Sequence, residues 1–214
     1  MYYITRLNKS FRSDLLWWHT FFQAWNGLSI LRHPAISNPD FYAQTDASGT
    51  WGCAAVLTPH WLQWQWPLEW QNMGIMAKEL VPIILTCIVW GPYLSRRHIN
   101  FQCDNANLVI SINKGSCKDK LVMHLLRSLS FFVAHFDIYL TASHLPGVIN
   151  VTADHLSRGN LHQAFQATPS LSSEPTLIPP SAFQLLSPHR LDWISPHFPQ
   201  LFQQTLSFIY QQNC

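Results

Sequence analysis

FYAQTDASGTWGCAAVLTPHWLQWQWP (residues 41–67) is the stretch that decides the fold. Residues 41–48 alternate as the residues of a strand do, and SGT (48–50) is a turn signal. Two further short strands follow at residues 51–58 and 61–67, separated by a Pro-His pair. The sequence therefore predicts an antiparallel meander of three strands.

Helix-like and strand-like patterns alternate after this meander. Apolar residues recur at helical spacing from Leu80 to Ile88, which predicts a helix that starts near Lys78 and holds Pro82 in its first turn or just past it. The next predicted elements are a strand at 98–104, a helix at 105–115 ended by Gly115, a helix at 119–134 capped by Asp119, a strand at 136–143, and a short helix at the end of 144–158. This order predicts an α/β fold with a mixed five-stranded sheet, three antiparallel strands and then two parallel ones, flanked by helices.

The chain divides into three regions that differ in composition and in residue pattern. Residues 1–40 hold an aromatic-rich run and then a turn-rich stretch, and residues 41–160 hold the predicted sheet domain. Pro and Ser accumulate in residues 161–214, which predicts a linker or an irregular, weakly folded segment. A last apolar-periodic stretch, residues 198–210, predicts a short helix.

Composition limits the classes of protein that this chain can belong to. It has 214 residues, of which 48% are hydrophobic and 11% charged, and its formal net charge is +2. There is ample material for a core, but no strong basic field, so nucleic-acid binding has to come from a local patch. The low charge and ten tryptophans indicate that a partner or a further part of a longer chain covers some apolar surface.

Cysteine spacing and the length of the apolar segments predict the cellular compartment. Five scattered cysteines argue against a disulfide framework or a zinc knuckle and favour a reducing compartment. The start, MYYITRLNKSFRSD, lacks the apolar segment of a signal peptide, and the apolar run 80–90 is too short to span a bilayer. We expect an intracellular protein of cytoplasm or nucleus that is neither secreted nor bound to a membrane.

Carboxylates are scarce, and four of the eleven stand at particular structural places. Asp46 lies inside a neutral strand, Asp104 closes another strand, Glu79 begins the first long helix and Asp154 begins the last one. An acid inside a strand is costly unless it is paired or coordinated. Four such acids together would repel one another, but two divalent ions roughly 4 Å apart turn them into a clamp for a phosphodiester. Oxygen ligands suit Mg²⁺ or Mn²⁺ better than zinc.

Each acid also has a purely structural interpretation, which is weakest for Asp46. Glu79 and Asp154 can be helix acids stabilised by the macrodipole, and Asp104 with Asn105 can be a strand-to-helix cap. The combination of four placements in this order of elements favours the metal site.

At this point the chain resembles a known family. TDASGTWGCAAVL, KEL, CDNANLVISIN and HLPGVINVTADHLSR resemble the successive motifs of type 1 ribonuclease H in retroelement polymerases, over residues 41–160. The resemblance implies an enzyme that hydrolyses the RNA strand of an RNA–DNA hybrid with two bound Mg²⁺ or Mn²⁺ ions. Its catalytic, metal-binding residues would be Asp46, Glu79, Asp104 and Asp154. Asn150 stands four residues before Asp154, as the family's Asn stands before its last acid.

The flanks resemble those of DIRS-type retrotransposons. DLLWWHTFFQAWNGLSIL (14–31) is similar to the segment that joins a polymerase thumb to the ribonuclease H domain. IPPSAFQLLSPHRLDWISPHFPQLF (178–202) is similar to the segment that precedes the tyrosine recombinase. The resemblance implies that polymerase and recombinase domains of a parent polyprotein are partners.

The resemblance also suggests which residues contact substrate. Ser48 and Asn105 are candidates for the nucleic-acid backbone or the 2′-hydroxyl, with a turn or capping role as the alternative. His144 stands at a strand end where the family has a His that is either structural or near the substrate, and Asn150 completes the motif. The loop at 145–149 is too short for the mobile His of cellular enzymes, so His155 is a possible substitute, with a surface His as the alternative.

Two expectations concern nucleic-acid binding as a whole. The basic protruding helix of some cellular enzymes is absent, so binding of the hybrid by this chain should be weak and its salt dependence modest. The aromatic run from Trp61 to Trp70 can stack on nucleic acid, but packing in the core or at an interface is the favoured interpretation.

Two rival functions remain. A transposase or integrase on the same fold uses two Asp and a final Glu on its last helix, whereas here Glu79 is on the first helix and Asp154 on the last, and this order counts against that rival. A catalytically silent transposon relic, acting only as a binding or scaffold module, is the alternative from another class.

Overall fold

The protein is built around one five-stranded sheet with the order β3-β2-β1-β4-β5. The computed structural model describes residues 7–23, 38–187 and 198–212. Strands β1, β2 and β3 pair antiparallel, and β4 and β5 extend the sheet from β1 by parallel pairing. The strands are β1 Phe41–Ala47, β2 Gly52–Leu57, β3 His60–Gln65, β4 His98–Cys103 and β5 Tyr139–His144. This confirms the predicted mixed sheet, with three antiparallel strands followed by two parallel ones.

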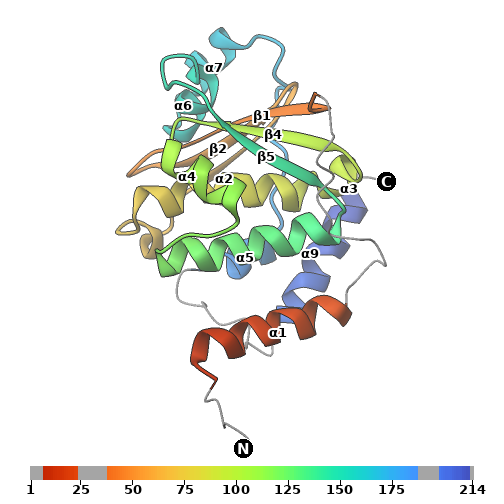
Figure 1. Cartoon of the computed structure of the whole chain (residues 1–214). Coiled ribbons are helices and arrows are strands. Elements are labelled where there is room, and N and C mark those ends of the chain that lie inside the picture. The colour runs from red at the N-terminus through yellow and green to blue at the C-terminus, as the bar shows by residue number, and fades with distance from the viewer. Residues whose placement is uncertain (1–6, 24–37, 188–197, 213–214) are drawn as a thin grey trace, which may run out of the picture.

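Helices cover both faces of the sheet (Figure 1). One face carries α2 (Ile75–Val89) and α5 (Lys120–His135), and the other carries α6 (Val151–Ser157) and α7 (Leu161–Ala167). The remaining helical elements are α1 Lys9–Gln23, η1 Leu68–Trp70, α3 Gly91–Leu94, α4 Ala106–Lys114, α8 Pro180–Leu185 and α9 Phe198–Gln212. None of the helices in the described ranges has the length and hydropathy that a bilayer span requires.

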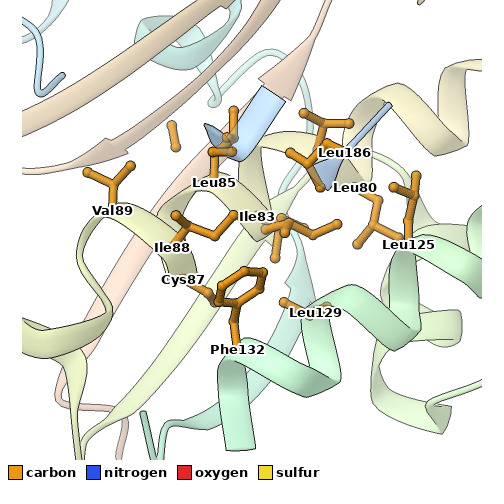
Figure 2. Close-up of a cluster of buried hydrophobic side chains, with 14 of the residues drawn as sticks. Leu80, Ile83, Leu85, Cys87, Ile88, Val89, Leu125, Leu129, Phe132 and Leu186 are labelled. Carbon is orange, nitrogen blue, oxygen red and sulfur yellow. The ribbon is translucent and has the colours of Figure 1, made fainter. Parts of the chain in front are cut away.

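The main core lies between the sheet and the α2–α5 layer. Figure 2 shows Ile83 and Ile88 of α2 facing Leu129 and Phe132 of α5. Every residue of α2 from Ala77 to Val89 is buried, so α2 is enclosed on all sides instead of exposing a polar face. A smaller cluster on the other face joins β2 and β3 to α6 and α7.

The start of α2 corrects one expectation. Gly74 is the N-cap, and its carbonyl oxygen accepts from Ala77 N–H at 3.1 Å, so the helix begins at Ile75 and not near Lys78. Pro82 therefore lies in the helix interior instead of the first turn. Glu79 lies in the second turn, beyond the part of the helix where the macrodipole stabilises an acid. The helix dipole therefore does not account for Glu79.

The other helix ends follow the local signals. Asn105 caps α4 and Gly115, at φ 69°, ends it in the left-handed region that glycine tolerates. Asp119 caps α5 as predicted, accepting from Leu121 and Val122 N–H. Strand β5 begins later than the predicted residue 136, because the chain first makes a turn with Asp137 at φ 55°.

The aromatic run of β3 and η1 packs inside the protein. Trp61, Trp66 and Trp70 are all buried. The rings of Trp66 and Trp70 stack with centroids 5.4 Å apart. Core packing was the favoured interpretation of this run, and the structure agrees with it.

Residues 161–187 are packed, contrary to the expectation of a linker or a weakly folded segment. Besides α7 and α8, the segment runs along β3, where Ser172 N–H donates to Pro59 O at 2.8 Å and Thr176 N–H to Trp61 O at 2.7 Å. The predicted helix at 198–210 is present as α9. The predicted connecting and linking roles of residues 24–37 and 188–197 lie outside the described residues.

Candidate metal centre

Three of the four predicted acids meet at one edge of the sheet. Asp46 is the sixth residue of β1, and Asp104 directly follows β4. Because β1 and β4 are parallel neighbours, their carboxyl ends lie side by side. Glu79 reaches the same place from the second turn of α2. One carboxylate oxygen of each residue lies within 4.8 Å of those of the other two.

The two buried acids are held by few hydrogen bonds. Asp46 and Glu79 are 5% and 4% exposed. The hydroxyl of Ser157, on α6, donates to Asp46 Oδ2, and Ala47 N–H donates to the Glu79 carboxylate. Glu79 Oε2 is buried with no hydrogen-bond partner within the described ranges. Such an atom costs free energy unless something binds it.

Burial and mutual repulsion disfavour the charged forms of these acids. Burial raises the pKa of Glu79 from 4.5 to about 9, with repulsion by Asp46 and Asp104 adding to the rise and the Ala47 hydrogen bond opposing it. Burial likewise raises the pKa of Asp46 from 3.8 to about 6; the Ser157 hydrogen bond opposes this, and the charges of Asp154 and Asp104 add to it. A cation at this place would favour ionisation of both groups.

The donor set fits a hard divalent cation. Three carboxylates from two strand ends and one helix offer oxygen ligands only, which suits Mg²⁺ or Mn²⁺. The unpartnered Oε2 of Glu79 supplies a free ligand atom. Asp104 is exposed, so the cluster opens to solvent on that side. A Cβ at Gly147 would lie 3.2 Å from Asp104 Oδ2. Because Gly147 has no side chain, the space beside the Asp104 carboxylate stays free.

Asp154 lies outside this cluster. It belongs to the first turn of α6, and its Oδ1 accepts from Arg158 Nε at 2.8 Å and Nη2 at 2.7 Å. Its charge nevertheless raises the pKa of Asp46, so it is close enough to act electrostatically. The role of Asp154 as a fourth ligand stays a prediction.

Ser48 and Asn105 make the hydrogen bonds of the turn and the cap that were the alternatives to substrate contact, and their contact with substrate stays a prediction. Ser48 Oγ accepts from Trp51 and Gly52 N–H, both at 2.9 Å, within the β1–β2 turn. Asn105 Oδ1 accepts from Leu108 N–H at 3.1 Å as the cap of α4. The turn and the cap account for both side-chain oxygens.

The other three candidate contacts differ in burial and in hydrogen bonding. Asn150 is fully buried, and its Nδ2 donates to Thr45 O at 2.9 Å, which ties the start of α6 to β1. His144 is exposed, with Nε2 3.1 Å from Asp104 O. His155 is half-buried, and its Nδ1 has no hydrogen-bond partner in the part of the chain that the structure describes.

Comparisons with known proteins add little. No family model matches the chain, and no curated protein matches it. A solved structure that it resembles is RNase H1 from the halophilic archaeon Halobacterium salinarum NRC-1, at 14% identity and a TM-score of 0.42. The match covers 58% of this chain and 98% of that one. A likeness of this strength carries no argument about activity.

Three residues around the cluster were missed from the sequence. Arg158 is four residues after Asp154, a helical spacing that allows an ion pair and was available as a signal. Ser157 reaches Asp46 across 111 residues, and no local pattern predicts that contact. Lys78 is 2% exposed and donates to Gly49 O at 2.6 Å and Gln71 O at 2.8 Å. It thereby links the β1–β2 turn to the helix that carries Glu79.

Proposed function

We propose that this chain is a ribonuclease H that hydrolyses the RNA strand of an RNA–DNA hybrid with divalent cations. We also propose that it belongs to the intracellular polyprotein of a DIRS-type retrotransposon, between a polymerase and a recombinase. The observation that supports catalysis best is the convergence of Asp46, Glu79 and Asp104 within 4.8 Å, with one buried oxygen of Glu79 unpartnered.

The residues of the cluster would hold two Mg²⁺ or Mn²⁺ ions, with Asp154 as the proposed fourth ligand. The bound ions supply an activated water and a positive charge beside the 3′ leaving oxygen. The protein contributes fixed ligands: Asp46 is oriented by Ser157, and Glu79 by the Ala47 N–H. Burial of both acids keeps bulk water away from two of the three ligands.

The substrate class follows from the motif resemblance and from the charge of the chain. A net charge of +2 gives no bulk attraction for any nucleic acid. Recognition then depends on the shape of the duplex and on the 2′-hydroxyl rather than on sequence. His144 is the exposed candidate contact nearest to Asp104, since its ring bonds to the Asp104 backbone.

The test is cleavage of a labelled RNA–DNA hybrid by the full chain with Mg²⁺ or Mn²⁺. We expect the RNA strand to be cleaved only when the cation is present. DNA–DNA and RNA–RNA duplexes of the same sequence should stay uncut. Asp46→Asn should be inactive. Asp137→Asn is the matched control, because Asp137 lies at a turn outside the cluster and Asn tolerates its φ of 55°. A folded wild type that leaves every hybrid intact with either cation would refute the proposal.

One observation favours the alternative, a silent binding or scaffold module. The carboxylate of Asp154 is engaged by Arg158, so the fourth predicted ligand is not in the cluster. The same assay separates the two functions: a relic would bind hybrid in a filter-binding experiment and leave it uncut.

A further inference from the structure

Arg158 is a basic residue next to Ser157, whose hydroxyl contacts Asp46. It is the C-cap residue of α6, and its side chain is 55% exposed. Two of its nitrogens contact one oxygen of Asp154. The neighbouring residue Ser157 has its hydroxyl within hydrogen-bond distance of both Asp46 Oδ2 and Asp154 O, so the ion pair of Arg158 with Asp154 lies beside the cluster.

The ion pair with Arg158 holds the carboxylate of Asp154. A cation bound at the cluster would compete with Arg158 for this carboxylate. Asp154 lies close to Asp46, because one Ser157 hydroxyl contacts Asp46 Oδ2 and, at 2.9 Å, the Asp154 backbone oxygen, yet the Asp154 carboxylate oxygens are not among the three that gather within 4.8 Å. Ion pairs with this much solvent exposure are weak, so the pair can exchange partners at small cost. A guanidinium forms bidentate hydrogen bonds with phosphate as well as with carboxylate.

We propose that Arg158 is a positioning residue that exchanges Asp154 for a phosphate of the nucleic acid. Without substrate, the guanidinium holds Asp154 away from the carboxylate cluster. When a phosphodiester arrives, the guanidinium turns to its oxygen atoms and the Asp154 carboxylate is released toward Asp46. The fourth ligand thus becomes available when substrate is present. This inference rests on the proposed nuclease function.

Metal binding without nucleic acid is the first test. We expect Arg158→Gln to bind Mn²⁺ more tightly than the wild type in calorimetry, by at most about fivefold, because an exposed ion pair and a nearby positive charge are removed. In an Asp154→Asn background the same substitution should give a smaller gain, since no carboxylate is left to release. Arg97→Gln is the control, since Arg97 is exposed and precedes β4, about 20 Å from Asp104 at the strand's other end.

Hybrid binding is the second test, and it needs no turnover. In the inactive Asp46→Asn background, Arg158→Gln should weaken binding, measured by fluorescence anisotropy over a salt series. The plot of the logarithm of the association constant against the logarithm of salt concentration has a negative slope. The magnitude of this slope should decrease by about one, as expected for one lost phosphate contact. Arg158→Lys, which keeps the charge, should retain most of the slope.

The outcomes separate this inference from the proposed function. If the wild type binds no Mn²⁺, or Asp46→Asn binds it equally well, the metal centre itself is wrong. If the wild type binds Mn²⁺ and cuts hybrid but Arg158→Gln changes neither Mn²⁺ affinity nor the salt slope, only the exchange is wrong and Arg158 is a structural cap. A thermal melt of each variant identifies any loss caused by unfolding.

Discussion

Glu79→Gln should stabilise the metal-free protein, and by more as the pH rises. The folded protein holds a proton on Glu79 up to a pKa of about 9, whereas the unfolded chain releases it near 4.5. Between these values the unfolded state binds fewer protons, so the wild type loses stability as pH rises. Each pH unit above 4.5 destabilises the wild type by about 1.4 kcal/mol relative to a neutral Gln, which amounts to roughly 3 to 4 kcal/mol by pH 7.

Urea unfolding with a chelator present measures this difference. We expect the unfolding free energies of Glu79→Gln and the wild type to be within about 1 kcal/mol at pH 5 and to separate by pH 7, with the variant more stable. Added Mg²⁺ should stabilise the wild type more than the variant, because it binds the folded carboxylates. Glu174→Gln, at an exposed residue of the packed tail, is the control and should show no such trend.

A constant difference between Glu79→Gln and the wild type from pH 5 to pH 7 would refute the reasoning. It would mean that Glu79 ionises in the folded protein as it does in the unfolded chain. The carboxylate would then be solvated or paired, and the cluster with Asp46 and Asp104 would not exist in solution.

Three further predictions test the surroundings of the cluster. Asp46→Asn should abolish cleavage of the hybrid while leaving the metal-free melting temperature unchanged or raised, because it removes a buried acid whose pKa burial raises to about 6; a large fall in melting temperature would contradict this. Ser157→Ala should weaken Mg²⁺ binding about tenfold in calorimetry, because Asp46 loses the hydroxyl that orients it, and an unchanged affinity would make Ser157 a packing residue only. Gly159→Ala should lower the unfolding free energy by about 1–3 kcal/mol, since Gly159 has φ 78° and an added Cβ would lie 2.6 Å from the Trp51 ring. Gly49→Ala, where a Cβ meets nothing within 4 Å, is its control in the same urea titration.

Much of the fold was predictable because its signals are local. The alternation in residues 41–67 gave the three antiparallel strands, and the caps at Asn105, Gly115 and Asp119 gave the ends of two helices. These signals act within a few residues, where side chains bond to the nearest backbone groups. The adjacency of Asp46 and Asp104 was also within reach, since the carboxyl ends of parallel neighbours meet at one sheet edge.

Contacts that join distant parts of the chain were decided by the tertiary structure. The burial of α2 on all sides, with Pro82 in its interior, depends on what packs around it. The packing of residues 161–187 along β3 rests on backbone hydrogen bonds that a Pro- and Ser-rich composition does not reveal.

The candidate site divides in the same way. Its acids stand at strand ends and in a helix that the sequence itself specifies, because strand alternation and helical periodicity are properties of neighbouring residues. Whether each carboxylate faces a cation or another side chain is a competition decided in space. Asp154 pairs with Arg158, while Asp46 takes the hydroxyl of Ser157. Free energies of burial and charge settle that competition, and they depend on neighbours that only the folded chain brings together.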